Sequence, residues 1–180
     1  MLAQKFLWRA RDSIILTKPR TPPPSLKFLF SHPAHLVACG FGSGLAPVAP
    51  GTFGTLFGWL AFLPLRQSMS DVLLLAVIAM CFFVGIGAVH KSGKDLGVVD
   101  HGSMVWDEVV PFWLVLFFVP TEWAWQLAAF ALFRLFDITK PPPASYFDRR
   151  VKNGFGVMMD DLCAAGYSIA VLLILRMVIG

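Results

Sequence analysis

Charged side chains are scarce in this chain of 180 residues. Asp, Glu, Lys and Arg together make up only 14% of it, whereas hydrophobic residues make up 57% and the mean hydropathy is +0.69. A typical soluble domain carries about a quarter charged residues. The deficit argues against a soluble globular protein. It indicates a small integral membrane protein, one domain by length, with polar loops between apolar segments.

Cysteine and histidine are also few, and their spacing excludes two kinds of site. The three cysteines lie in or beside apolar runs without paired spacing, so we expect small buried side chains and no disulfide framework: Cys39, Cys81 and Cys163. The four histidines lack zinc-binding spacing and are expected at the surface or the membrane interface: His32, His35, His90 and His101. Only His101, between Asp100 and Gly102, is a candidate for a role near chemistry.

The chain shows no internal repeat and no low-complexity tract, and we expect no secretory signal peptide because the leader is basic and rich in proline. Residues 1–34 are expected to form a tail, and residues 35–180 a membrane-embedded domain. The mixed apolar and basic residues of 1–17 could lie flat on an anionic membrane surface, and a frayed basic tail is the equal alternative. Residues 18–24 contain four prolines and are expected to be a linker.

Five apolar segments follow the tail. The sequence predicts helices over 52–63, 71–89, 109–119, 122–136 and 162–180, with a turn at 64–70. The second is the strongest transmembrane candidate, and the last is also long enough to cross a bilayer. The third and fourth are each too short for about 30 Å of hydrocarbon and are expected to form a hairpin supported by the longer helices. The six tryptophans are expected to anchor the interface.

The net charge of +4 comes from basic residues that flank these segments, so we expect a lipid bilayer and not a nucleic acid as the partner. If the segments run alternately out and back, thirteen of the fifteen Lys and Arg residues fall on the N-terminal side, and only Arg66 and Arg176 on the other. The positive-inside rule then makes that side cytoplasmic. All the polar loops would meet on this face.

Glycine and proline crowd residues 35–51, where no regular helix or strand is expected. A helix is expected to open at Thr52, directly after Gly51. Glycine-rich backbone ahead of a helix N-terminus can hold a phosphate. The closing Gly-Lys-Ser/Thr of a Walker loop is missing, and a loop packed tightly between helices is the alternative.

Acidic residues gather where the apolar segments begin or end. Asp107 and Glu108 precede one segment, Asp137 follows another, and the pair Asp160-Asp161 stands before the last. Ionisable groups at the ends of membrane-embedded segments are functional candidates. Adjacent carboxylates favour a bound cation, or one of them stays protonated. A helix cap needs only one Asp, and solvated acids at a polar membrane surface are the other alternative.

The acids have basic neighbours, and together they point to a reaction. Mg²⁺ needs only one or two carboxylates plus substrate phosphate. Arg134 and Lys140 supply phosphate-binding charge close to the acids. Acidic residues suited to binding a cation, basic residues close to them and a membrane-embedded domain together indicate phosphoryl chemistry on a lipid headgroup.

Several blocks of sequence follow one another between about residues 35 and 166: Gly42-Ser43-Gly44 with Pro47 to Gly54, Asp100 to Ser103 with Val105 to Glu108, Phe133 to Asp137 with Lys140-Pro141, Phe147-Asp148-Arg149, and Gly154-Phe155-Gly156 with Met159-Asp160-Asp161 and Ala165-Gly166. These blocks, in this order, closely resemble the phosphatidylglycerophosphatase A family. The basic tail lies outside the resemblance.

The resemblance implies an all-α, Mg²⁺-dependent phosphatase of the bacterial inner membrane. Such an enzyme would remove the terminal phosphate of phosphatidylglycerophosphate and leave phosphatidylglycerol for phospholipid biosynthesis. One departure stands out, because the family usually has glycine three residues after the Glu where this chain has Pro111. Proline is tolerated in the first turn of a helix, where we expect this one to lie.

The family's acidic positions map onto Asp107, Glu108, Asp137, Asp160 and Asp161, with Arg134 and Lys140 as its basic members. The residues expected to be catalytic are Asp107, Glu108, Asp137, Lys140, Asp160 and Asp161. Those expected to bind substrate are Arg134, Lys140, Asp100, His101, Gly51 and Thr52. Mg²⁺ is expected on Glu108, Asp160 and Asp161, with Asp107 or Asp137 helping. Water could attack directly, or Asp137 or Asp161 could first form an acyl-phosphate.

Two other classes of function fit less well. A transporter would relay ions through its carboxylates, but the expected inverted repeat is missing and its acids should lie at mid-membrane. A membrane-bound scaffold would explain the basic tail but not the adjacent acids.

Overall fold

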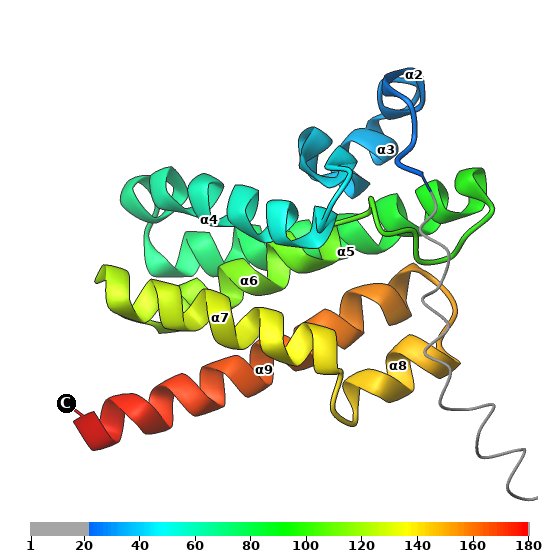
Figure 1. Cartoon of the computed structure of the whole chain (residues 1–180). Helices are drawn as coiled ribbons and strands as arrows, with labels where there is room; N and C mark the ends of the chain where they lie inside the picture. Colours follow the sequence, from blue (N-terminus) through cyan, green and yellow to red (C-terminus); the bar gives the residue numbers. More distant parts are fainter. Residues whose placement is uncertain (1–21, 180) are drawn as a thin grey trace, which may run out of the picture.

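A computed structural model describes residues 22–179, and every regular element in that range is helical (Figure 1). The elements are α2 (Leu26–Leu29), α3 (Pro33–Ala38), the 3₁₀ helix η1 (Gly40–Leu45), α4 (Pro50–Ser68), α5 (Asp71–Leu96), α6 (Trp106–Phe118), α7 (Trp123–Thr139), α8 (Ala144–Arg150) and α9 (Gly154–Ile179). The expected all-α class is confirmed. The amphipathic stretch 1–17 and most of the linker lie outside the described residues.

Helix α6 is the centre of the bundle and contacts α4, α5, α7 and α9. Nine of its 13 residues are buried, and Phe112 and Val115 have no exposed surface. Figure 1 shows α6 behind α7, with α4, α5 and α9 around it. A helix that is apolar on all sides is stable only when other helices cover it. Helix α6 can be shorter than a membrane span because the helices around it, and not lipid, cover its apolar surface.

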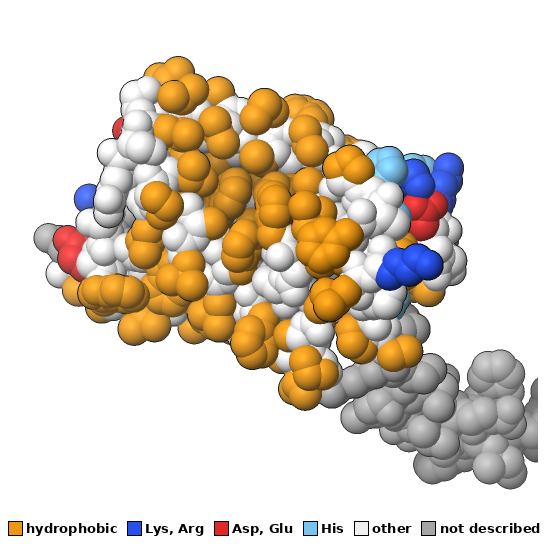
Figure 2. Space-filling view, turned by 90° about the horizontal axis from the view of Figure 1, so that it is seen from above, with side chains coloured by type: hydrophobic (Ala, Val, Ile, Leu, Met, Phe, Trp, Pro, Cys, Tyr) orange, Lys and Arg blue, Asp and Glu red, His pale blue; other side chains and the backbone are white. Residues whose placement is uncertain are grey.

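Two of the helices, α5 and α9, are long and apolar enough to cross a membrane, with mean hydropathies of 2.9 and 2.2 over their most apolar windows. Only 28% and 22% of those windows are buried inside the protein. The core helix of a soluble protein would be mostly covered, whereas these two turn most of their apolar surface outward. Figure 2 shows hydrophobic side chains over the middle of one face and charged side chains at its two ends.

Several helix boundaries differ from the expected ones. Residues 35–51 are not irregular throughout, because α3 and η1 occupy most of them, with left-handed backbone at Phe41 (φ 55°) and Gly42 (φ 102°). The expected turn at 64–70 is instead the last turn of α4, which continues through Pro64 to Ser68. Helix α5 continues past the apolar segment to Leu96 and ends at Gly97 in the left-handed conformation.

Helices α6 and α9 both begin earlier than expected, and both shifts affect acidic residues. Helix α9 begins at Gly154, so Asp160 and Asp161 lie within its second turn and not ahead of it. Gly154 permits this start because a Cβ there would lie 2.2 Å from the Ile86 carbonyl oxygen of α5. Helix α6 begins at Trp106, which places Pro111 beyond the first turn. Since proline has no N–H, the carbonyl of Asp107 receives no helical hydrogen bond from residue 111.

Some residues expected at the surface are instead part of the interior. His35 is 3% exposed, and its Nε2 lies 2.7 Å from Asp95 Oδ2, which ties α3 to α5. Trp59, Trp106 and Trp113 pack in the hydrophobic core, so the expectation of interface anchors is wrong for these three. All three cysteines are free thiols, of which Cys39 is buried and the other two are partly buried.

Candidate active site

The predicted acidic residues meet at one end of the bundle, where the ends of four helices come together. Asp107 and Glu108 lie in the first turn of α6, and Asp137 lies in the last turn of α7. Asp160 and Asp161 come from the N-terminal part of α9, and the N-terminus of α4 approaches Glu108. Helices that run alternately in opposite directions bring these segments together although they are far apart in sequence.

Three of the carboxylates form a compact cluster. One oxygen each of Glu108, Asp137 and Asp161 lies within 4.8 Å of the other two. Asp137 is 8% exposed and Asp161 only 2% exposed. Oxygen ligands at this spacing suit a hard divalent cation such as Mg²⁺. Without a cation, three adjacent carboxylates, two of them buried, repel one another, so the donor set fits the expected metal.

Arg134 lies against this cluster. Its Nη1 is 2.7 Å from Asp137 Oδ2 and 3.1 Å from Glu108 Oε2. The same nitrogen donates a hydrogen bond to Thr55 Oγ1 at 3.4 Å, and the Thr55 hydroxyl donates to the carbonyl of Gly51. Arg134, which we expected to bind phosphate, therefore neutralises and orients two carboxylates in this structure.

Lys140 occupies the other side of the site. It forms an ion pair with Asp160 and lies 3.9 Å from Asp148. Burial alone would lower the pKa of Lys140, but Asp161 and Asp160 raise it well above its ordinary value, so the amine stays charged. Asp160, which we expected to bind the metal, is thus paired with a lysine, and Asp137 takes its place in the cluster.

Asp107 has an unusual environment for a carboxylate. It is 7% exposed, and its Oδ1 has no hydrogen-bond partner. Asp107 and Glu108 lie outside the two candidate membrane spans, and burial is the main reason that the pKa of each is raised. The pKa of Glu108 reaches about 8, because Arg134 only partly offsets burial and the nearby Asp137. Such carboxylates ionise readily only when a cation is near.

Gly51 determines how closely α4 approaches the cluster. A Cβ at this position would lie 2.0 Å from Glu108 Oε1 and 2.6 Å from Glu108 Cδ. Only glycine leaves room for the carboxylate at this distance. Thr52, the next residue, is partly buried. The glycine predicted to bind substrate thus contacts a catalytic candidate directly.

Asp100 and His101 lie in the link between α5 and α6. Asp100 lines a small pocket with Asp148, Lys152 and Asp160 beside α8. His101 is buried, and its Nδ1 accepts a hydrogen bond from the backbone N–H of Ser103 at 3.1 Å. The structure therefore brings Asp100 to the Asp160 side of the site, and His101 stabilises the turn that leads into α6.

One residue of the site was not predicted. Thr55 is fully buried and joins Arg134 to the backbone of Gly51. The available signal was its spacing, since residues four apart on a helix share a face and Thr55 follows Gly51 by one turn.

Comparison with known proteins assigns the family. The sequence profile of Phosphatidylglycerophosphatase A matches residues 36–176. A protein of Haemophilus influenzae with that name is 48% identical over 149 residues, which are 82% of this chain and 91% of the relative. Another of that name, from Escherichia coli, is 44% identical over 148 residues, which are 79% of this chain and 83% of the relative.

A third relative has a different name. A provisionally named phosphatidylinositol-3-phosphatase of Bacteroides thetaiotaomicron is 40% identical over 152 residues, which are 81% of this chain and 94% of that protein. No solved structure matches the chain. The family profile and the two relatives that share its name confirm the resemblance seen in the motifs, and the chain therefore belongs to the phosphatidylglycerophosphatase A family and is a phosphatase.

Proposed function

We propose that this phosphatase hydrolyses the terminal phosphate monoester of phosphatidylglycerophosphate, releasing inorganic phosphate and phosphatidylglycerol, and that it requires Mg²⁺. One observation carries the proposal: Glu108, Asp137 and Asp161 converge at the end of a bundle whose family acts on phosphate esters. The lipid substrate in this proposal is taken from the names of the Haemophilus influenzae and Escherichia coli relatives.

The metal ligands of the proposal are Glu108, Asp137 and Asp161. Asp160 is left out because its carboxylate is already paired with Lys140. When bound, Mg²⁺ supplies positive charge that stabilises the negative charge developing on the phosphate oxygens. The three carboxylates would hold the cation, and Arg134 fixes the orientation of Glu108 and Asp137 through its two ion pairs.

The remaining side chains position the substrate. Lys140, charged and held by Asp160, lies where it can attract the phosphate of the lipid. Asp107 presents an unpartnered Oδ1 at the same end of the bundle, where it can accept a hydrogen bond from the attacking water. Hydrolysis forms a bond between the water oxygen and phosphorus as the bond between phosphorus and the glycerol oxygen breaks, and a proton given up by the water ends on the glycerol oxygen.

The proposal places the enzyme in the bacterial inner membrane as a multi-pass protein with its site toward the cytoplasm. Helices α5 and α9 are suited to cross the bilayer by length and composition. The charge distribution along the sequence supports the orientation, because thirteen of fifteen Lys and Arg residues would fall on the side of the acidic segments if the five apolar segments alternate across the bilayer.

The test is phosphate release by the purified full chain from phosphatidylglycerophosphate, phosphatidic acid, phosphatidylinositol 3-phosphate and glycerol phosphate. Each substrate is assayed with Mg²⁺ and with a chelator. We expect the highest kcat/KM on phosphatidylglycerophosphate and loss of activity in chelator. Equal efficiency on glycerol phosphate would count against a lipid substrate. A preference for the inositol lipid would assign the specificity suggested by the name of the third relative instead.

A further inference from the structure

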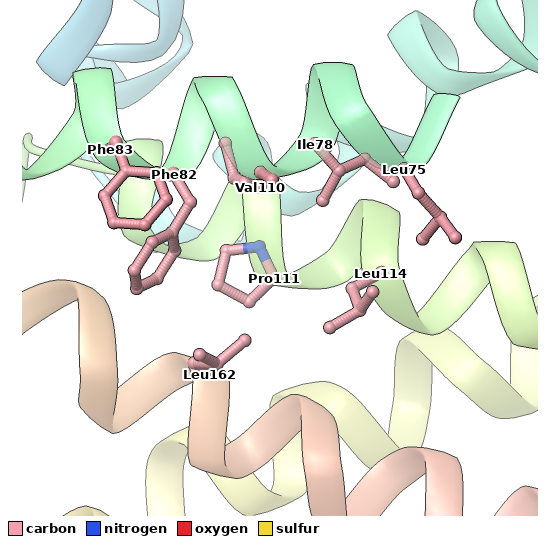
Figure 3. Close-up of a pocket in the computed structure, with 9 residues that line it drawn as sticks. Leu75, Ile78, Phe82, Phe83, Val110, Pro111, Leu114 and Leu162 are labelled. Carbon is pink, nitrogen blue, oxygen red and sulfur yellow. The ribbon is translucent and has the colours of Figure 1, made fainter. Parts of the chain in front are cut away.

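An apolar groove lies between α5, α6 and α9 and encloses about 470 Å³. Figure 3 shows Ile78 and Phe82 of α5, Val110, Pro111 and Leu114 of α6 and Leu162 of α9 around the same space. Every residue that lines it is apolar. The volume falls within the range of ligand pockets, roughly 300–1,000 Å³.

Two of the helices that line the groove, α6 and α9, also carry carboxylates of the site. Leu162 directly follows Asp161 in α9. On α6, Val110 and Pro111 follow Asp107 by three and four residues, which places all three on one face of the helix. The unpartnered Oδ1 of Asp107 is therefore one helical turn from the apolar lining. One helical turn rises about 5.4 Å, which is short compared with the glycerol and phosphate of a lipid headgroup.

We propose that this groove holds one acyl chain of the lipid substrate while the phosphate lies at the carboxylate cluster. The inference rests on the proposed function and adds how the substrate is oriented. Two of the groove's three walls, α5 and α9, are the candidate membrane spans, so the groove opens on surface suited to lipid tails. The wholly apolar lining selects a hydrocarbon chain, since a peptide would bring backbone groups without hydrogen-bond partners.

The groove acts by orienting the substrate. A chain that moves from bilayer to groove gains little, because both surroundings are apolar. A chain that comes from water gains about fourfold in affinity for each methylene buried. The contribution is therefore measurable with short-chain substrates that dissolve as monomers.

The experiment uses the full chain in lipid nanodiscs and phosphatidylglycerophosphates with acyl chains of increasing but short length. Ala79→Phe fills the groove from α5, and Leu114→Trp fills it from α6. Ala76→Phe is the matched control, because Ala76 is exposed on the same helix and does not line the groove. We expect kcat/KM to rise several-fold per added methylene in the wild type and in the control. We expect little dependence on chain length in both filled variants, with activity on the shortest substrate retained.

The outcomes separate this inference from the function on which it rests. If the wild type hydrolyses none of the lipid phosphates, the proposed function is wrong and the inference falls with it. If the wild type is active but its kcat/KM does not depend on chain length, only the groove assignment is overturned. The same holds if both filled variants keep the wild-type dependence, which would assign the groove to ordinary bilayer lipid.

Discussion

Replacing Gly51 with alanine tests whether the exact place of the Glu108 carboxylate matters for activity. The added Cβ would lie 2.0 Å from Glu108 Oε1. Ordinary contacts need about 3.5 Å, so the carboxylate must move by roughly 1.5 Å. Arg134, 3.1 Å from the other oxygen of Glu108, resists that movement. A displacement of about 1 Å can reduce turnover about 100-fold, and we expect a loss of that size in kcat/KM.

The same substitution should leave the fold nearly intact. Alanine is favoured over glycine within a helix by up to about 1 kcal/mol, which offsets part of an overpacking cost of roughly 1–3 kcal/mol. The melting temperature should therefore fall by only a few degrees. Gly166→Ala in α9 is the matched control, because nothing lies within 4 Å of a Cβ at that position. It should keep wild-type activity.

A second substitution distinguishes displacement of Glu108 from other effects. Glu108→Asp shortens the side chain by one methylene and makes room for the new methyl group. The cost of Gly51→Ala should then be much smaller in the Glu108→Asp background than in the wild type, which a double-mutant cycle measures. A Gly51→Ala enzyme with wild-type kcat/KM, or strictly additive effects in the cycle, would refute the reasoning.

Two further predictions concern the metal and the orientation. The Asp161→Asn variant should fold, but it should lose nearly all phosphatase activity and the rise in melting temperature that Mg²⁺ gives the wild type. The Asp71→Asn variant, which changes an exposed acid paired with Arg66, should keep both. A wild type whose activity and melting temperature do not respond to chelator would contradict the metal site. In a variant without the three native cysteines, a new cysteine beside Arg66 should react with an impermeant reagent from the periplasm and one beside Arg149 should not; periplasmic labelling at Arg149 would reverse the orientation.

The sequence was sufficient to predict which acids gather and that the fold is helical. Asp107, Glu108, Asp137 and Asp161 stand next to apolar segments, and antiparallel helices bring such ends together regardless of detail. The expected membrane helices at 71–89 and 162–180 correspond to α5 and α9, the two candidate spans of the described residues, although α5 ends later and α9 begins earlier than expected. The helical class and the two long apolar helices were predictable because length and hydropathy are local properties that the sequence displays directly.

The partners of individual side chains were not predictable from the sequence. Arg134 could serve phosphate or carboxylates, and only packing shows that Glu108 and Asp137 lie within reach. Asp160 and Asp161 are adjacent in sequence, yet their directions on α9 differ by about 100° because a helix turns that far per residue. One therefore meets Lys140 and the other meets the carboxylate cluster. Helix ends also shifted where glycine allowed close backbone contact, as at Gly154.

The charge balance of the site links stability to function. Five acids meet two cationic side chains there, so the acids outnumber the cations by three: the acids are Asp107, Glu108, Asp137, Asp160 and Asp161, and the cations are Arg134 and Lys140. A phosphate dianion approaching such a site would be repelled. A divalent cation reduces the repulsion among the carboxylates and the repulsion toward the substrate at once. The cation should therefore bind before the lipid phosphate or together with it, and a metal-free protein should bind the lipid phosphate weakly as well as fail to hydrolyse it.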